Sequence, residues 1–451
     1  MASASSAPIH ESRALEKAAL AVACVTLGAR MFHLIATHAV NLLWVDEWEL
    51  YGAFWKNASW SQLFFWQSGP QRQGISFILL KYLAEATDWD SKTTAFAVGA
   101  LVALSCAAAL SLKRRIAGEF ELSDLIIPLI FFTPQQYEIF LGPAIPAYSS
   151  FPQLLVLFFC LARTLASIWL RYGLAVVIDF LAIYSGYGFF LGLVAPLLFL
   201  LDALRARKGR RPLETKVAWC ALLASLASLL SFFWGYRFNP AAACFRFPLT
   251  PVWNYPRFMA LMFANPLRLK GHGPLTTLAG FLLLGLALYL LRRCLQQGWK
   301  ERSPSAALDR ASAALLGFVL FYSSAAAAGR LCFGLDAAQE SRYVVFMNLA
   351  LLAFYLQSLT WPRGVTRSRA MAAFAVILAA GQIFLSHRDR VQMEYFRQVK
   401  TAWKQCYLQQ EDIPRCDAAA GAAAFPLPAA TQMQEKLQYM KERKLNLYNG
   451  R

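Results

Sequence analysis

Residues 44–73 read WVDEWELYGAFWKNASWSQLFFWQSGPQRQ. Three carboxylates, Asp46, Glu47 and Glu49, come directly after an apolar run, where a charged group is partly desolvated and the end of the preceding helix fixes its position. Tryptophan recurs in the same stretch at positions 44, 48, 55, 60 and 66, and its ring favours the headgroup level of a bilayer. The stretch therefore predicts short re-entrant or interfacial helices at the mouth of a membrane span.

The composition of the chain points to a membrane protein. Of 451 residues, 58% are hydrophobic and only 16% are charged, against about 25% charged in an ordinary soluble domain. The net charge of +18 comes from basic residues that gather in short connections between apolar runs. This is the pattern of cytoplasmic loops, so we expect membrane lipids and no nucleic acid as partners.

The apolar runs predict an all-α polytopic fold, because a span needs about 20 mostly apolar residues. We expect about eleven spans within residues 1–385, with the first span retained as an anchor and the N-terminus inside. Basic clusters at 113–115 and 205–211 mark inner ends, which places the first loop, residues 44–92, on the outer side. A further interfacial helix is expected at 74–86, and residues 386–451 are expected as an outer tail.

One predicted span, at 122–140, is interrupted at Thr133-Pro134. Prolines at 134, 143, 146 and 152 would leave backbone groups unsatisfied in lipid, so this segment must be buried in protein or line a cavity. A second break is expected at residues 184–188, YSGYG, where two spans meet in a tight turn.

The cysteines and the short motifs add weaker constraints. Cys406 and Cys416 lie in the predicted outer tail, where an oxidising compartment allows a disulfide, and Cys244 with Cys332 is a second candidate pair. No CxxC pair, HExxH motif or glycine-rich phosphate loop occurs. Zinc and nucleotide sites therefore have no motif to support them.

Three segments together resemble the GT-C superfamily of integral membrane glycosyltransferases. They are VDEWEL at 45–50, TPQQYE at 133–138 and GRLCFGLDAAQESRY at 329–343. Within that superfamily the chain is similar to an uncharacterised bacterial group with an aspartate-rich first loop and related second and third segments. Where that group has a histidine-rich stretch, this chain has SGPQR at 68–72.

The resemblance implies a GT-C-like bundle that acts as an inverting glycosyltransferase in a bacterial inner (plasma) membrane, with its site facing the periplasm or the cell exterior. The donor would be a polyprenyl-phosphate sugar, and the acceptor a glycan, a lipid or a protein. Asp46, with Glu47 as the second candidate, would take the proton from the acceptor hydroxyl.

The leaving lipid phosphate needs fixed positive charge. Arg330 and Arg342 are predicted to supply it, with Arg72 as a weaker candidate, and Tyr343 is predicted to stack on sugar. Gln136 and Glu138 of the TPQQYE segment complete the predicted substrate-binding residues.

Several alternatives stay open at this point. Asp46 and Glu47 also suit the solvated end of a span, and the arginines also suit lipid anchoring. No metal site is predicted, although two carboxylates and a phosphate would suit Mg²⁺ or Mn²⁺. A transporter or flippase for a lipid-linked sugar, or a non-catalytic subunit of an envelope polysaccharide assembly complex, are the alternative functions.

Overall fold

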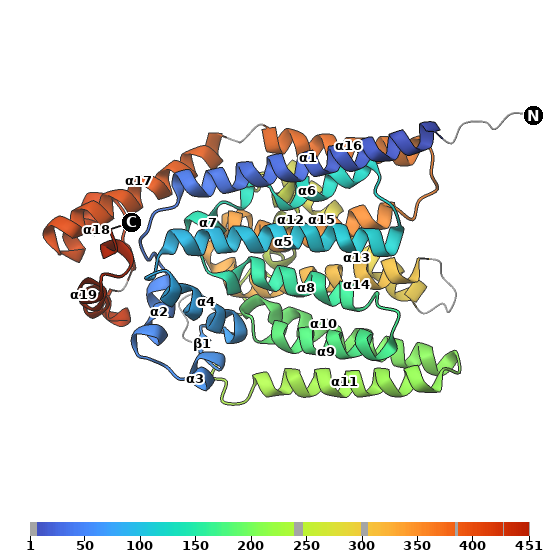
Figure 1. Ribbon diagram of the computed structural model, residues 1–451, viewed down its shortest axis with the longest axis horizontal. Helices are drawn as coiled ribbons and strands as arrows, with labels where there is room; N and C mark the ends of the chain where they lie inside the picture. Colours follow the sequence, from blue (N-terminus) through green and yellow to red (C-terminus); the bar gives the residue numbers. More distant parts are fainter. Residues whose placement is uncertain (1–6, 239–246, 299–304, 384–386, 427, 451) are drawn as a thin grey trace, which may run out of the picture.

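The protein is described by a computed structural model that covers residues 7–238, 247–298, 305–383, 387–426 and 428–450. Most of these residues are helical, and the strands among them are the two-residue β1 (Gln67–Ser68) and β2 (Gln71–Arg72), which pair as an antiparallel hairpin. The long helices run side by side along the longest axis of the molecule (Figure 1). The predicted all-α class is therefore confirmed for the described residues.

Six helices in the described residues are long and apolar enough to cross a membrane. A seventh results if the bent pair α16 (Val365–Ile383) and α17 (His387–Gln410) forms one span. The six helices are α1 (Ala7–His38), α5 (Ser91–Ala117), α10 (Phe189–Lys208), α11 (Pro212–Phe232), α13 (Pro274–Gly298) and α14 (Ala306–Arg330).

The remaining predicted spans form shorter apolar helices. These are α6 (Ile126–Phe131), α8 (Ser150–Ala162), α9 (Ile168–Ile183) and α15 (Val344–Ser358). None reaches the roughly 20 residues that a straight span requires. Helix lengths in the described residues therefore support six or seven spans, and the predicted number of eleven is not established by them.

Local sequence signals explain where these helices begin and end. The Asp90 carboxylate accepts a hydrogen bond from the backbone N–H of Lys92 (3.0 Å) and caps α5. The same helix carries Arg114 and Arg115 in its last turn, and it stops at Gly118, whose φ of +83° suits glycine. Both ends of this span are thus encoded in the sequence next to them.

The predicted break at Thr133-Pro134 is present. Helix α6 ends at Phe131, and the 3₁₀ turn η2 (Pro134–Gln136) and the one-turn helix α7 (Glu138–Leu141) follow it. Residues of this segment are buried in protein, as the proline content requires. The second break also occurs, because α9 ends at Ile183 and η4 (Gly186–Gly188) leads into α10.

The first loop and the C-terminal tail lie at the same end of the bundle. The loop forms α2 (Glu47–Trp55), α3 (Trp60–Phe64), the hairpin and α4 (Gly74–Ala86), and α4 has the predicted bounds. The tail forms α17, α18 (Ile413–Ala420) and α19 (Met433–Arg443), which cover the loop at the left of Figure 1. The connections after α5 and α10 lie at the opposite end, as the predicted sidedness requires.

Loop and tail share one hydrophobic core. Trp48 and Tyr51 of α2 pack in a cluster with Trp403 and Tyr407 of α17 and Leu437 of α19. Backbone hydrogen bonds join the two segments as well, from Val45 N–H to the Ala424 carbonyl (2.8 Å), for example. The tail is therefore packed into the first loop through burial of apolar surface.

This packing corrects the prediction of a tryptophan belt at the headgroup level. Trp44 and Trp48 are buried in the shared core, whereas Trp60 is 49% exposed and its ring centroid lies 5.0 Å from that of Tyr82. Tail residues cover the rings that the sequence alone would leave for lipid. Only part of the predicted belt is available for membrane contact.

The segment after α11 is packed into the bundle. Helix α12 (Asn254–Ala264) packs against α13 and α14 and buries Phe258, Leu261 and Met262. In the tail, the predicted Cys406–Cys416 disulfide is present and confirmed. Cys244 of the second candidate pair lies outside the described residues.

Candidate functional site

The two adjacent carboxylates of the first loop have different environments. Glu47 is 1% exposed, and its carboxylate accepts hydrogen bonds from the backbone N–H groups of Trp44 (2.8 Å) and Ala144 (3.2 Å). Asp46 is half-buried, and its side chain makes no hydrogen bond or ion pair within the described part of the chain. Of the two predicted catalytic carboxylates, Asp46 is therefore the one whose oxygens remain available.

Glu47 is held by the tail. Lys400 of α17 is 3% exposed and donates from Nζ to the carbonyl of Gly142 (2.9 Å). Gly142 lies two residues before Ala144, whose backbone N–H donates to Glu47. Burial raises the pKa of Glu47 to about 7, while the Lys400 charge opposes this rise. Glu47 and Lys400 thus fix the 142–144 segment from two sides, which makes Glu47 a structural anchor of the loop.

A second tail lysine contacts the same helix of the loop. Lys436 of α19 is 3% exposed and donates from Nζ to the carbonyl of Trp48 in α2. Burial lowers the pKa of Lys436 to about 8. The tail therefore orients the turn that carries Asp46 through two buried cations, Lys400 and Lys436.

Asp46 lies close to a group of hydroxyls. Tyr148 Oη is 3.2 Å from Ser68 Oγ, and Ser68 Oγ donates to Glu49 Oε1 (3.3 Å). Burial raises the pKa of Tyr148, and the negative charge of nearby Asp46 raises it further. The Tyr148 phenol therefore stays protonated, and because Ser68 gives its proton to Glu49, Tyr148 donates to Ser68 Oγ near the Asp46 carboxylate.

Tyr187 connects this group to the arginine side of the site. Its ring centroid lies 5.7 Å from that of Tyr148 and 5.3 Å from that of Tyr322 on α14. The η4 turn places Tyr187 here, and it requires glycine at 186, where φ is +69° and a Cβ would lie 2.5 Å from the Ala147 carbonyl oxygen. Tyr187 also lies within electrostatic range of Arg342.

Arg342 is flanked by two carboxylates. Its guanidinium pairs with Glu340 and lies 3.8 Å from Glu138, measured from Nη1 to Oε1. Glu138 Oε2 also accepts from the Arg342 backbone N–H (3.2 Å) and from Ser341 Oγ (3.3 Å). The broken span and the 329–343 segment therefore meet at this ion-pair cluster.

Arg330 is the freer of the two predicted phosphate ligands. It is half-buried, its side chain makes no hydrogen bond or ion pair with any residue that the structure describes, and its guanidinium lies 5.7 Å from the ring centroid of Phe333. Its charge reaches both Glu340 and Tyr343. Arg330 therefore offers all of its N–H donors at the edge of the cluster.

The other predicted binding residues have mainly structural contacts. Arg72 is 2% exposed and donates to the carbonyls of Phe65 and Trp234 and, at 2.8 Å, of Phe232, so it joins the hairpin to the end of α11. Gln136 is fully buried and donates to the Phe131 carbonyl (2.6 Å). Tyr343 is 3% exposed, and its ring packs 6.3 Å from that of Tyr322.

Sequence reasoning missed Ser68, Tyr148, Tyr187 and the tail lysines. Tyr187 belongs to a turn that was recognised only as a turn, and Tyr148 lies in the proline-rich segment that was expected to be buried in protein or to line a cavity. The turn and the proline-rich segment are thus the sequence signals that mark Tyr187 and Tyr148. Nothing in the local sequence around Lys400 distinguishes it from a surface lysine.

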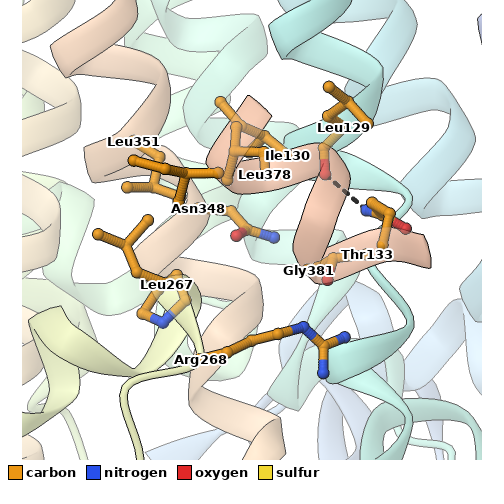
Figure 2. A pocket seen from close by; sticks show the side chains of 12 residues that line it. Leu129, Ile130, Thr133, Leu267, Arg268, Asn348, Leu351, Leu378 and Gly381 are labelled. Atoms are coloured by element: carbon orange, nitrogen blue, oxygen red, sulfur yellow. Dashed lines mark hydrogen bonds between the residues drawn. The ribbon is translucent and has the colours of Figure 1, made fainter. Parts of the chain in front are cut away.

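The described residues contain no group of three or more His, Cys, Asp or Glu side chains that could hold a metal ion. A cavity of about 10 Å³ lies elsewhere, where Arg268 and Asn348 face the space between α6, α15 and α16 (Figure 2). It has room for about one water molecule, and it is separate from the residues described above.

Comparisons with known proteins give no identification. The chain matches no known protein family, no curated protein and no solved structure. The function is therefore inferred from the geometry of the chain itself.

Proposed function

We propose that the protein is an inverting glycosyltransferase that moves a sugar from a polyprenyl-phosphate donor to an extracytoplasmic acceptor, which is a glycan, a lipid or a protein. One observation carries the proposal. The Asp46 carboxylate and the Arg330 guanidinium, both without a partner among the described residues, lie at the two sides of a tyrosine group at one end of an apolar bundle. A base and a cation on opposite sides of a hydroxyl-rich site suit transfer to a hydroxyl from a phosphate ester.

In the proposed reaction, Asp46 accepts the proton of the acceptor hydroxyl while the acceptor oxygen bonds to the anomeric carbon. The bond from that carbon to the phosphate oxygen breaks, and the polyprenyl phosphate leaves with the electron pair. Arg330, with Arg342 beside it, stabilises the phosphate charge. A single displacement inverts the configuration at the anomeric carbon, and Tyr148 and Ser68 orient sugar hydroxyls.

The proposal includes the finer topology. The short apolar helices α6, α8, α9 and α15 complete about eleven crossings if each crosses with its flanking turns, and the basic ends of α5 and α10 favour an inner position for that end in a bacterial plasma membrane. A divalent cation between Asp46 and Glu47 would have to coordinate Glu47 oxygens that are buried and already accept two backbone hydrogen bonds. We therefore assign phosphate stabilisation to the arginines.

Transfer assays test this function directly. The purified full chain in nanodiscs is incubated with a panel of polyprenyl-phosphate sugars and with glycan and lipid acceptors, and the product is identified by mass spectrometry. We expect transfer from at least one donor, and a loss of about 10²–10⁴-fold in Asp46→Asn, which keeps the shape but cannot accept the proton.

Glu85→Gln is the matched control, because Glu85 is a 53% exposed carboxylate of the same loop. Its transfer rate should equal that of the wild type. Unchanged transfer in Asp46→Asn would show that Asp46 is not the base. If no donor in the panel reacts while the protein moves lipid-linked sugar across a liposome membrane, the glycosyltransferase assignment is wrong.

The transporter alternative has one specific observation in its favour. Asp179 of α9 is fully buried, and Ser225 of α11 donates to one of its oxygens, while the other has no hydrogen-bond partner in the part of the chain that the structure describes. Buried carboxylates inside a bundle are typical of proton-coupled transport. Asp179→Asn should abolish flux if this alternative holds, and should leave sugar transfer intact if the glycosyltransferase proposal holds.

A further inference from the structure

At the end opposite the first loop, a buried ion pair fixes the ends of three helices. Lys113 Nζ of α5 lies 2.8 Å from Asp124 Oδ2 in η1 (Leu122–Leu125), and the two side chains are 1% and 0% exposed. Tyr355 of α15 donates to the other oxygen of Asp124. The charges of Lys113 and Asp124 therefore cancel, and the ion pair joins the end of α5 to η1.

Near this ion pair, Arg363 and Arg367 share the carboxylate of Glu121. Arg367 Nη2 lies 2.9 Å from Glu121 Oε2, and Arg363 Nη2 lies 3.1 Å from Glu121 Oε1. Each guanidinium has five N–H donors, so most donors of both side chains remain for a ligand. Two positive charges against one negative charge leave an excess of one positive charge at this position.

These groups enclose a cavity of about 240 Å³ between the ends of α5, α15 and α16, lined by Lys113, Glu121, Trp361, Arg363 and Arg367. The helix ends that form it lie at the right of Figure 1, away from the tail. Trp361 is 44% exposed at the rim, where an indole ring suits the headgroup level of a bilayer. The opening of the cavity thus lies beside an exposed indole at this end of the bundle.

We propose that this cavity binds the phosphate ester of an anionic headgroup from the leaflet at this end of the bundle. Basic pockets between membrane helices bind such headgroups. Arg367, only 10% exposed, supplies a fixed cation inside the cavity, while Arg363, 83% exposed, reaches the phosphate from the rim. The site is separate from the proposed transfer site and does not depend on the transfer reaction.

Native mass spectrometry of the detergent-solubilised full chain tests the site, with phosphatidylglycerol and phosphatidylcholine as probes. We expect phosphatidylglycerol to bind more tightly than phosphatidylcholine, and the double variant Arg363→Gln/Arg367→Gln to lose about 10-fold or more in phosphatidylglycerol affinity. Glu121→Gln should bind phosphatidylglycerol more tightly, because it releases both guanidiniums.

The control is Arg115→Gln/Arg369→Gln, which removes two exposed charges from the same end outside the cavity lining. This control should keep the affinity of the wild type. Unchanged affinity in Arg363→Gln/Arg367→Gln, or an equal loss in the control, overturns the proposal. If size exclusion shows that the double variant does not fold, Glu121→Gln decides alone, and an affinity that does not rise overturns the site.

Competition distinguishes the two sources of the phosphate ester. Glycerol 3-phosphate and inorganic phosphate, added at millimolar concentration, should fail to displace phosphatidylglycerol if the ligand is a lipid. Displacement by either would assign the cavity to a free phosphate compound. Loss of phosphatidylglycerol preference over phosphatidylcholine in the wild type would overturn the headgroup site itself.

Discussion

The two ends of the bundle use buried lysines in different ways. At the end that holds the 240 Å³ cavity, Lys113 lies 2.8 Å from the Asp124 carboxylate and also donates to the Glu119 carbonyl. At the loop end, Lys400 and Lys436 donate to the backbone carbonyls of Gly142 and Trp48, and Lys400 also acts on Glu47 through its charge. A direct ion pair therefore joins the helix ends at the first end. At the loop end the side chain of Asp46 makes no hydrogen bond or ion pair with the described residues.

The largest expected effect is the loss of stability when Lys400 of the loop end is replaced. Lys400→Met leaves Glu47 buried without its cation and the Gly142 carbonyl without its donor, which should destabilise the fold by about 3–5 kcal/mol. Thermal unfolding measures the loss, and hydrogen exchange locates it. We expect faster exchange in residues 44–89 and 387–450.

Two variants sharpen this result. Lys113→Met removes a lysine of similar burial at the end that holds the 240 Å³ cavity, so faster exchange should be confined to the ends of α5, α15 and α16. Lys441→Met breaks an exposed ion pair with Glu411 and should cost less than about 1 kcal/mol. Equal exchange patterns in Lys400→Met and Lys113→Met would contradict the proposed separation of the two ends.

The next effect concerns the unpaired guanidinium. Arg330→Gln removes a charged donor from the proposed phosphate position, which should weaken donor binding by about 1.5–3 kcal/mol, or roughly 10–100-fold in KM. The measurement is the donor concentration dependence of transfer in nanodiscs. Arg292→Gln, an exposed arginine at the other end, is the control and should behave as the wild type. A normal KM in Arg330→Gln would remove Arg330 from the donor site.

The smallest expected effect is on the pH dependence of tail docking. Burial raises the pKa of Glu47 from 4.5 to about 7, so between these values the folded chain binds a proton that the unfolded chain has released. Stability should therefore fall as pH rises from about 5 to 7, by on the order of 1–3 kcal/mol. Lys400, whose pKa burial lowers to about 8, stays charged in both states over this range.

Glu47→Gln should flatten this pH dependence, because the amide oxygen keeps accepting backbone hydrogen bonds but does not titrate. Thermal unfolding at several pH values measures the slope for the wild type and the variant. A slope of the opposite sign in the wild type would show that the lysine and the backbone donors dominate, and that Glu47 is ionised in the folded protein throughout this range.

Local patterns in the sequence determined the class of the protein and its breaks. Apolar runs predicted the all-α membrane fold, Thr133-Pro134 predicted the interrupted helix, and the ten-residue spacing of Cys406 and Cys416 allowed the disulfide. These features depend on neighbours in the chain, because helix period, proline geometry and short loop closure act over a few residues. Sequence could find them for that reason.

Only the tertiary structure decided which carboxylate is free. Asp46 and Glu47 are adjacent and chemically similar. Yet the Glu47 carboxylate accepts a hydrogen bond from the N–H of Ala144, 97 residues away, and lies near the charge of Lys400 in the C-terminal tail. The tyrosine group likewise joins Tyr148 and Tyr187 to Tyr322 from three separate helical segments. Such contacts arise from burial against distant segments, which no local periodicity encodes.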